Sequence, residues 1–211
     1  MRKGKSNRKS NKLIEAYKSL LKKFGHQNWW PVNRNFKPKE WEICVGAILT
    51  QNTNWRNVEK ALDNLAKAKI ISPADVQKTE LKKLEELIRP SGFYKQKAIR
   101  LKALADFVLG FGSFENFKKN IERSELLKVK GVGFETCDSI LLYACGKRYF
   151  VIDAYTKRFI KSLGIRTKMD YESLRKYFEK RLPRSVSLYK EFHALIVEWG
   201  KESFRIVNSK E

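Results

Sequence analysis

The fold of this chain is decided by the segment Val129-Lys130-Gly131-Val132-Gly133-Phe134-Glu135-Thr136-Cys137. The residues on both sides of this segment carry apolar side chains at helical spacing, so it is predicted to be a turn between two helices. Gly131 and Gly133 can adopt backbone angles that a Cβ forbids, and they leave amide N–H groups uncovered where the second helix begins. Uncovered amides and the dipole of a helix N-terminus together bind phosphate. The segment therefore predicts a phosphate-binding turn.

A single carboxylate follows this turn inside an apolar strip. The strip reads Val151-Ile152-Asp153-Ala154-Tyr155. One interpretation is that Asp153 only caps a helix that begins at Ala154, which is a common role for aspartate. The other is chemistry on a nucleic acid, because an acid comes after a phosphate-binding turn. The two roles are compatible.

The composition of the chain indicates a polyanionic partner. Its 211 residues suffice for one large domain or two small ones, and its formal net charge is +22. We interpret the partner as nucleic acid; the alternatives are the surface of a thermophile's protein or a ribosome-bound protein. The hydrophobic share of 42% and the aromatic share of 12% indicate a packed globule.

The cysteines and the N-terminus narrow the class further. Cys44, Cys137 and Cys145 lack the close spacing of a zinc or iron–sulfur site, and we interpret them as buried small residues in a reducing cytoplasm. The chain has no apolar run of about 18 residues, so no membrane span is predicted. Residues 1–12 lack the apolar core of a signal peptide and are interpreted as a mobile basic arm that touches the DNA backbone.

Helical periodicity runs through the rest of the chain, so the fold class is predicted to be all-α. The predicted helices lie at 13–24, 40–49, 56–67, 80–88, 115–128, 136–144, 154–163 and 171–178, and three more are predicted without fixed ends: a short one that starts at Pro73, one that follows 93–97, and a last one after Ser185 or Ser187. The short apolar stretch 149–152 is the one segment with any strand character.

The phosphate-binding turn and the strip after it resemble the helix-hairpin-helix DNA glycosylases (HhH-GPD), the superfamily that contains endonuclease III. The family hairpin is Leu-Pro-Gly-Val-Gly-x-x-Thr-Ala, matched here by 129–137, and its Val-Asp-x-x-x-x-Arg is matched by Ile152 to Arg158. The resemblance implies a six-helix barrel at 37–146, with the hairpin motif at about 122–144. A second lobe would join 1–36 to 147–211. Double-stranded DNA with a damaged base would lie between the lobes of a monomer that is cytoplasmic and nucleoid-associated.

The resemblance also implies how the bond between base and sugar is broken. Asp153 would be the catalytic acid that stabilises the positive sugar, since the sugar gains charge as this bond opens. Relatives that also nick DNA carry a lysine directly before the hairpin threonine, where this chain has Glu135. A carboxylate cannot form an imine, so we expect a glycosylase without strong lyase activity. Glu135 is also an acid of the type favoured in a first helical turn. Lys130 and Lys157 lie nearby in sequence, so weak lyase activity is an open alternative.

Several residues would contact DNA if the resemblance holds. They are Gln51, Phe93, Lys130, Gly131, Val132, Gly133 and Glu135. Gln51 would enter the gap left by the extruded base, and the alternative is an ordinary hydrogen bond in its loop. Phe93 would wedge into the duplex. The chain lacks the four clustered cysteines that hold the iron–sulfur cluster of endonuclease III, so we expect no cofactor. A monovalent cation at the DNA-bound hairpin is the exception.

The aromatic residues suggest which base is removed. Trp29, Trp30, Pro31 and Trp55 match the pattern of 3-methyladenine DNA glycosylases. An N-alkylated purine is positively charged, and aromatic rings attract such a base by cation–π and stacking interactions. The alternative is that these tryptophans are core residues or fill a gap between domains. We interpret His26 and His193 as structural and assign neither to a metal.

Two other functions remain possible at this stage. One is an endonuclease III-like glycosylase and lyase that acts on oxidised pyrimidines or mismatches. The other is a non-catalytic protein that uses the hairpin only to bind DNA. Glu135 argues against the first alternative, and Asp153 argues against the second.

Overall fold

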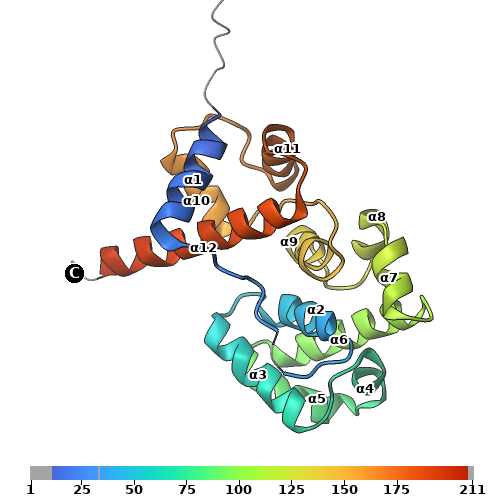
Figure 1. Cartoon of the computed structure of the whole chain (residues 1–211). Helices are drawn as coiled ribbons and strands as arrows, with labels where there is room; N and C mark the ends of the chain where they lie inside the picture. The colour runs from blue at the N-terminus through green and yellow to red at the C-terminus, as the bar shows by residue number, and fades with distance from the viewer. Residues whose placement is uncertain (1–10, 33, 209–211) are drawn as a thin grey trace, which may run out of the picture. The chain divides into compact units, whose positions relative to one another are not determined.

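The computed structural model describes residues 11–32 and 34–208, and their regular structure is entirely helical (Figure 1). This confirms the predicted all-α class. The stretch Tyr149 to Ile152 has no regular structure and pairs with no strand among the described residues, so its strand character is not realised. Most of the predicted basic arm, residues 1–10, lies outside the described part of the chain.

The chain divides into two compact units. The terminal unit combines Met1–Trp29 with Ile152–Glu211, and the central unit is Trp30–Val151. The boundaries thus fall after Trp29 and Val151, whereas the division expected from the resemblance places them after residues 36 and 146. Trp29 and Trp30, which are adjacent in sequence, belong to different units.

The central unit consists mostly of short helices, several of which pack around the buried helix α2. In order they are α2 (Lys39–Leu49), α3 (Trp55–Lys67), α4 (Pro73–Lys78), α5 (Leu81–Ile88), η1 (Arg89–Ser91), α6 (Tyr94–Leu109), α7 (Phe114–Asn120), α8 (Arg123–Leu126), α9 (Phe134–Ser139) and η2 (Ile140–Ala144). Residues 41–49 of α2 are all buried, because α3, α6, α9 and η2 pack around it. The burial of α2 therefore fixes the positions where the loops at its two ends begin.

Polar side chains cap several helix starts. Ser72 accepts from the backbone N–H of Asp75, and the Asp75 carboxylate accepts from the N–H of Ser72 in return. Asn54 caps α3 by accepting from the N–H of Asn57 at 3.1 Å. Such caps satisfy amide groups that have no partner within the helix.

The hairpin region departs from the predicted helices at two places. The run predicted at 115–128 is broken into α7 and α8, because the backbone of Ile121 is extended and its side chain is buried. The helix predicted at 136–144 begins earlier, at Phe134, and its last turn, η2, is a π-helical turn in which Cys145 N–H donates to Ile140 O at 3.1 Å. A π turn of this kind is rare and is not visible in apolar spacing.

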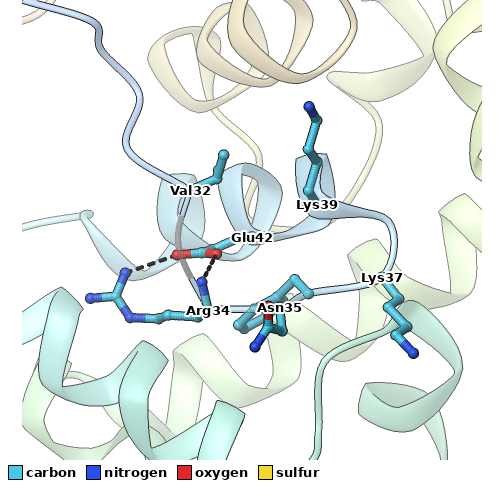
Figure 2. Close-up of a pocket in the computed structure, with 7 residues that line it drawn as sticks. Val32, Arg34, Asn35, Lys37, Lys39 and Glu42 are labelled. Atoms are coloured by element: carbon cyan, nitrogen blue, oxygen red, sulfur yellow. Dashed lines mark hydrogen bonds and ion pairs between the residues drawn. The ribbon is translucent and has the colours of Figure 1, made fainter.

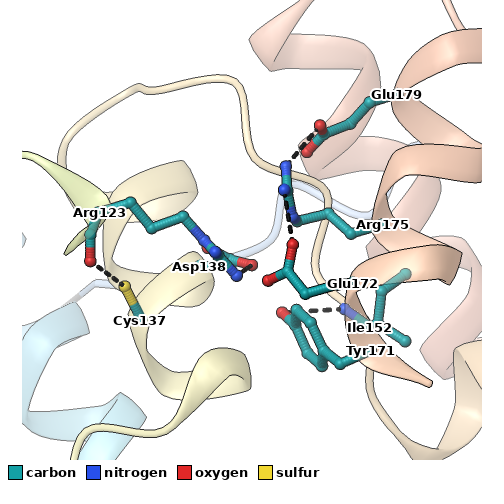
Figure 3. Close-up of polar contacts among 8 residues, drawn as sticks. All are labelled: Arg123, Cys137, Asp138, Ile152, Tyr171, Glu172, Arg175 and Glu179. Carbon is teal, nitrogen blue, oxygen red and sulfur yellow. Dashed lines mark hydrogen bonds and ion pairs between the residues drawn. The ribbon is translucent and has the colours of Figure 1, made fainter. Parts of the chain in front are cut away.

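An ion pair joins the two helices of the hairpin. The guanidinium of Arg123 on α8 donates to both oxygens of Asp138 on α9, at 2.6 and 3.0 Å (Figure 3). Asp138 is fully buried, and the rings of Phe134 and Tyr149 lie within 5.3 and 5.7 Å of the guanidinium. A bidentate pair of this kind fixes the angle between two helices as well as their distance.

The terminal unit is built on the long helix α12. Its elements are α1 (Lys12–Phe24), α10 (Ala154–Ser162), α11 (Tyr171–Arg181) and α12 (Val186–Asn208). α12 packs against both α1 and α10. The ring of Phe192 on α12 contacts the rings of Tyr17, Phe159 and Phe178, which come from the other three helices. On α11, Arg175 donates to Glu172 and Glu179 at 2.8 and 2.6 Å, as Figure 3 also shows.

Candidate active site

The hairpin turn shows why its two glycines differ. Gly131 has φ +86°, a left-handed backbone that strongly favours glycine, and an added Cβ would lie 2.3 Å from Cγ of Arg100. Gly133 has φ −87° and ψ 178°, angles open to any residue, and an added Cβ would meet no atom within 4 Å. Of the two glycines that can adopt special backbone angles, only Gly131 does so.

The open space at Gly133 lies where the hairpin helix begins. Gly133 is the N-cap of α9 and no side chain caps this helix end. Lys130 and Glu135 are exposed beside it, whereas Val132 is buried and anchors the turn. An uncapped, uncovered helix start beside a lysine has the geometry that binds a phosphate.

Gln51 is hydrogen-bonded to this turn. It lies in the loop between α2 and α3, where its Nε2 donates to Gly131 O at 3.0 Å and to Thr136 Oγ1 at 2.9 Å. Its Oε1 accepts from the guanidinium of Arg100 on α6. The side chain of Gln51 thus bonds to the hairpin and to α6, which are distant in sequence, and not to its own loop as the predicted alternative had it. Its entry into a duplex stays a prediction.

Phe93 is presented to solvent by a strained turn. Its side chain is 66% exposed, and its backbone is left-handed with φ +46° directly before α6. Such angles are costly for a residue with a large side chain and persist only where neighbours hold them. Lys97, one helical turn later on α6, is such a neighbour: its buried Nζ donates to Ser91 O at 2.7 Å and to Leu49 O at 2.8 Å.

Asp153 lies at the N-terminus of α10 and caps it. One carboxylate oxygen, Oδ1, accepts from Thr156 N at 2.7 Å and from Thr156 Oγ1 at 2.8 Å. The other oxygen, Oδ2, lies 3.6 Å from Nε2 of His193 on α12. Burial alone would raise the pKa of the Asp153 carboxyl, but His193 and the Thr156 donors together bring this pKa below its usual value of 3.8. Asp153 is therefore an ionised carboxylate with one oxygen committed to the helix.

The predicted aromatic residues separate between the two units. In the central unit, the ring of Trp30 packs edge-to-face on Trp55 at 5.4 Å and near Tyr143 of η2 at 5.5 Å. A Cβ at position 46 would lie 3.0 Å from the Trp30 ring, so Gly46 of α2 lets this ring approach closely. Pro31 is exposed. We call Trp30, Trp55 and Tyr143 the aromatic cluster.

Trp29 belongs to the terminal unit, whereas the aromatic cluster belongs to the central unit. Nζ of Lys201 on α12 lies 5.6 Å from the centre of its ring. Asp153 belongs to the same unit. The acid and one tryptophan are thus parts of the terminal unit, whereas the hairpin and the aromatic cluster are parts of the central unit.

A cavity of about 320 Å³ lies elsewhere, before and around the start of α2 (Figure 2). Its lining consists of Val32, Arg34, Asn35, Phe36, Lys37, Lys39 and Glu42. The buried carboxylate of Glu42 accepts from the Arg34 backbone N–H at 3.1 Å and from its guanidinium at 2.8 Å. No residue predicted for chemistry or DNA contact lines this cavity, so we do not assign it to the active site.

Sequence reasoning assigned no part in these arrangements to four residues. They are Arg100, Thr136, Tyr143 and His193. Thr136 was quoted only as part of the hairpin motif, and all four are brought to their partners by packing over long sequence separations. No group of three or more metal-ligating side chains occurs in the part of the chain that the structure describes, and no helix there is long and apolar enough to cross a membrane.

Comparisons with known proteins agree with this architecture. A family model described as HhH-GPD superfamily base excision DNA repair protein matches residues 45–184. The chain is 46% identical over 200 residues to a candidate DNA repair glycosylase of Methanocaldococcus jannaschii, covering 92% of this chain and 89% of that protein. It is 28% identical over 171 residues to endonuclease III of Thermotoga maritima, covering 80% of this chain and 76% of that one.

Solved structures show the same fold. The 3-methyladenine DNA glycosylase MagIII of H. pylori, bound to 1,N6-ethenoadenine, aligns with a TM-score of 0.80 and 39% identity over 92% of this chain and 97% of that chain. A non-covalent endonuclease III–DNA complex aligns with a TM-score of 0.69 and 22% identity over 89% and 84%, which shows the fold alone. The chain therefore belongs to the HhH-GPD superfamily of base excision repair DNA glycosylases, as its hairpin and the acid that follows it indicated, and DNA is its partner.

Proposed function

We propose that this glycosylase removes N-alkylated purines such as 3-methyladenine from double-stranded DNA by hydrolysis. The observation that carries the proposal is the aromatic cluster, in which Trp30 is held against both Trp55 and Tyr143. Rings that are fixed in place before a base arrives lose little entropy when it binds. An alkylated purine carries positive charge, and π faces attract it more strongly than they attract a normal base. The likeness to a 3-methyladenine DNA glycosylase supports the same choice.

The chemistry that we assign to this chain needs one acid and one water molecule. The bond between the sugar and the alkylated base breaks, and its electron pair leaves with the base and neutralises the base's charge. Asp153 faces the positive sugar with an ionised carboxylate, which stabilises the charge and orients the attacking water. The water adds to the sugar carbon, and its proton passes to Asp153 or to solvent. Because the leaving base is already charged, no strong general acid is required.

Glu135 supports a reaction without strand cleavage. It occupies the second position of α9 and is exposed beside the phosphate-binding turn. A lysine there would supply the amine for an imine with the sugar, and a carboxylate cannot. We propose that strand breaks appear only when the abasic product is treated with alkali.

The remaining contacts follow from the hairpin. We propose that the amides at Gly133, with Lys130, bind a phosphate, that Phe93 wedges into the duplex, and that Gln51 fills the gap left by the extruded base. We further propose that the enzyme acts as a monomer, requires no resident cofactor, and takes at most a monovalent cation at the DNA-bound hairpin.

Two duplexes test the proposal, one with a single 3-methyladenine and one with an oxidised pyrimidine. Released bases are separated by chromatography, and strands are analysed with and without alkali. We expect release of 3-methyladenine and strand breaks only after alkali. Nicking of the oxidised duplex without alkali would replace this function by the endonuclease III-like one, and the absence of base release from both duplexes would favour a protein that only binds DNA.

A further inference from the structure

The side-chain amide of Gln51 is fully engaged in the structure. Both hydrogens of Nε2 are donated, one to Gly131 O at 3.0 Å and one to Thr136 Oγ1 at 2.9 Å. Its oxygen accepts a charge-assisted hydrogen bond from Arg100. We call these four residues the Gln51 cluster. All of them belong to the central unit.

Arg100 reaches Gln51 across the hairpin turn. Its aliphatic stem lies against Cα of Gly131, where an added Cβ would be 2.3 Å from Cγ. Its second terminal nitrogen lies 3.4 Å from Oε1 of Gln96, one turn away on α6. Because Gly131 has no Cβ, it allows the left-handed turn and also leaves room for the Arg100 side chain that holds Gln51.

The loop that carries Gln51 is anchored at its start. Lys97 lies one helical turn before Arg100 on α6, and its buried ammonium binds Leu49 O at the end of α2. The same ammonium binds Ser91 O beside the Phe93 turn. α6 therefore fixes the backbone before Gln51 and the turn that presents Phe93, while Arg100 holds the Gln51 side chain on the hairpin.

We propose that Arg100 and Thr136 are positioning residues that hold Gln51 on the hairpin until DNA offers it other partners. The inference rests on the gap-filling role of Gln51 in the proposed function. To enter a duplex, the Gln51 amide must give up all three hydrogen bonds of the cluster. An intact, stacked duplex offers nothing in exchange, whereas the orphaned base opposite an extruded nucleotide offers donors and acceptors. Gln51 therefore leaves the hairpin only after extrusion.

Stopped-flow fluorescence tests the inference directly. The probe is a duplex with a tetrahydrofuran abasic-site analogue opposite 2-aminopurine, whose emission reports insertion of Gln51 beside it. Wild-type protein is expected to show a binding phase that depends on protein concentration, then a slower phase that does not. The Gln51→Ala variant should lose the slower phase. The Thr136→Val variant, which keeps shape and charge, should accelerate it about fivefold, the factor that one neutral hydrogen bond is worth.

Two further variants separate release of Gln51 from other effects. Arg100→Met should accelerate the slower phase more than Thr136→Val does, and it should also slow the binding phase because one positive charge is lost. Thr79→Val removes a hydroxyl that donates to Asp75 O at 2.7 Å on α4, far from the hairpin in sequence, and should change neither phase.

Two outcomes would overturn the inference. A slower phase that is unchanged or retarded in Thr136→Val, although Gln51→Ala abolishes it, would mean that the cluster only supports the hairpin. A slower phase that persists in Gln51→Ala would mean that Gln51 does not fill the gap. Neither readout involves base release, so a failure to excise alkylated purines would leave the inference standing.

Discussion

Nε2 of His193 lies 3.6 Å from Oδ2 of Asp153, and both residues belong to the terminal unit. His193 comes from α12 and Asp153 from the start of α10, two helices that pack on each other. Burial would favour a neutral carboxyl, but His193 and the Thr156 donors keep the pKa of Asp153 below its usual value. The position that we assign to catalysis thus carries negative charge in a site that is only 13% exposed. A buried charge of this kind acts more strongly on a charged sugar than one in water.

Replacing Asp153 with asparagine should abolish base release but keep DNA binding. Asparagine can still cap α10 by accepting from Thr156 N–H, so the helix start is preserved while the charge is lost. We expect single-turnover release of 3-methyladenine to fall at least about 100-fold. The matched control is Asp170→Asn, the same change at the N-cap of α11, where the carboxylate accepts from Ser173 N at 2.9 Å. Unchanged release in Asp153→Asn, or an equal loss in Asp170→Asn, would contradict the assignment.

The partnership with His193 predicts a specific pH dependence. A carboxyl whose pKa is depressed in the folded state contributes stability above its unfolded pKa, near 3.8, and loses it as the pH falls through the folded value. The acid limb of base release that is due to Asp153 should therefore lie below the pH expected for an ordinary aspartate. His193→Gln should move this limb to higher pH, because His193 is one of the groups that lower the pKa of Asp153. Rate–pH profiles of the two proteins measure the shift, and coincident profiles would refute it.

The sequence predicted local structure well and long-range partnerships poorly. The helix at 13–24 and the cap at Asp153 follow from periodicity and from a hydrogen-bonding side chain, which act within a few residues. The break at Ile121 was missed because the run 115–128 contains no glycine or proline that would mark it. His193 was interpreted as structural because nothing in its own segment points to an acid forty residues earlier.

The two hairpin glycines should respond in opposite ways to alanine. Gly131→Ala forces a Cβ onto a left-handed backbone and against the stem of Arg100, so we expect a loss of roughly 1–2 kcal/mol of stability. Gly133→Ala meets no neighbour and should leave stability almost unchanged, but its methyl group covers the amides that the proposed phosphate approaches. We expect DNA binding to be about tenfold weaker, which corresponds to the free energy of one hydrogen bond to a charged group. Urea denaturation and a binding titration separate the two effects, and equal behaviour of the two variants would contradict this account.

Introducing a lysine at position 135 should create lyase chemistry. The Glu135→Lys variant places an amine at the second residue of α9, beside the phosphate-binding turn. After base loss, this amine can form an imine with the open sugar, which borohydride reduces to a stable protein–DNA link. We expect the trapped product from Glu135→Lys and none from wild type or Glu135→Gln. Trapping by the wild-type protein would show that Lys130 or Lys157 supplies an amine and that the enzyme has lyase activity of its own.

The buried Lys97 should make stability depend on pH in an unusual direction. Burial first, and then the charge of Arg100, lower the pKa of Lys97 from 10.5 to about 8 in the folded protein. Between these two values the unfolded chain binds more protons than the folded one, so the free energy of unfolding rises with pH. The gain reaches up to about 3 kcal/mol for a shift of this size.

The Lys97→Met variant isolates this contribution. It should be less stable than wild type at neutral pH, because Leu49 O and Ser91 O lose their buried donor, at a cost of about 1–3 kcal/mol each. The difference should widen as the pH rises from 7 to 10.5, since only the wild type is relieved of a buried charge. Denaturant unfolding at a series of pH values measures it, with Lys95→Met as the control, because Lys95 is exposed on the same helix. A difference that stays constant or narrows with pH would show that Lys97 remains charged in the folded protein throughout this range.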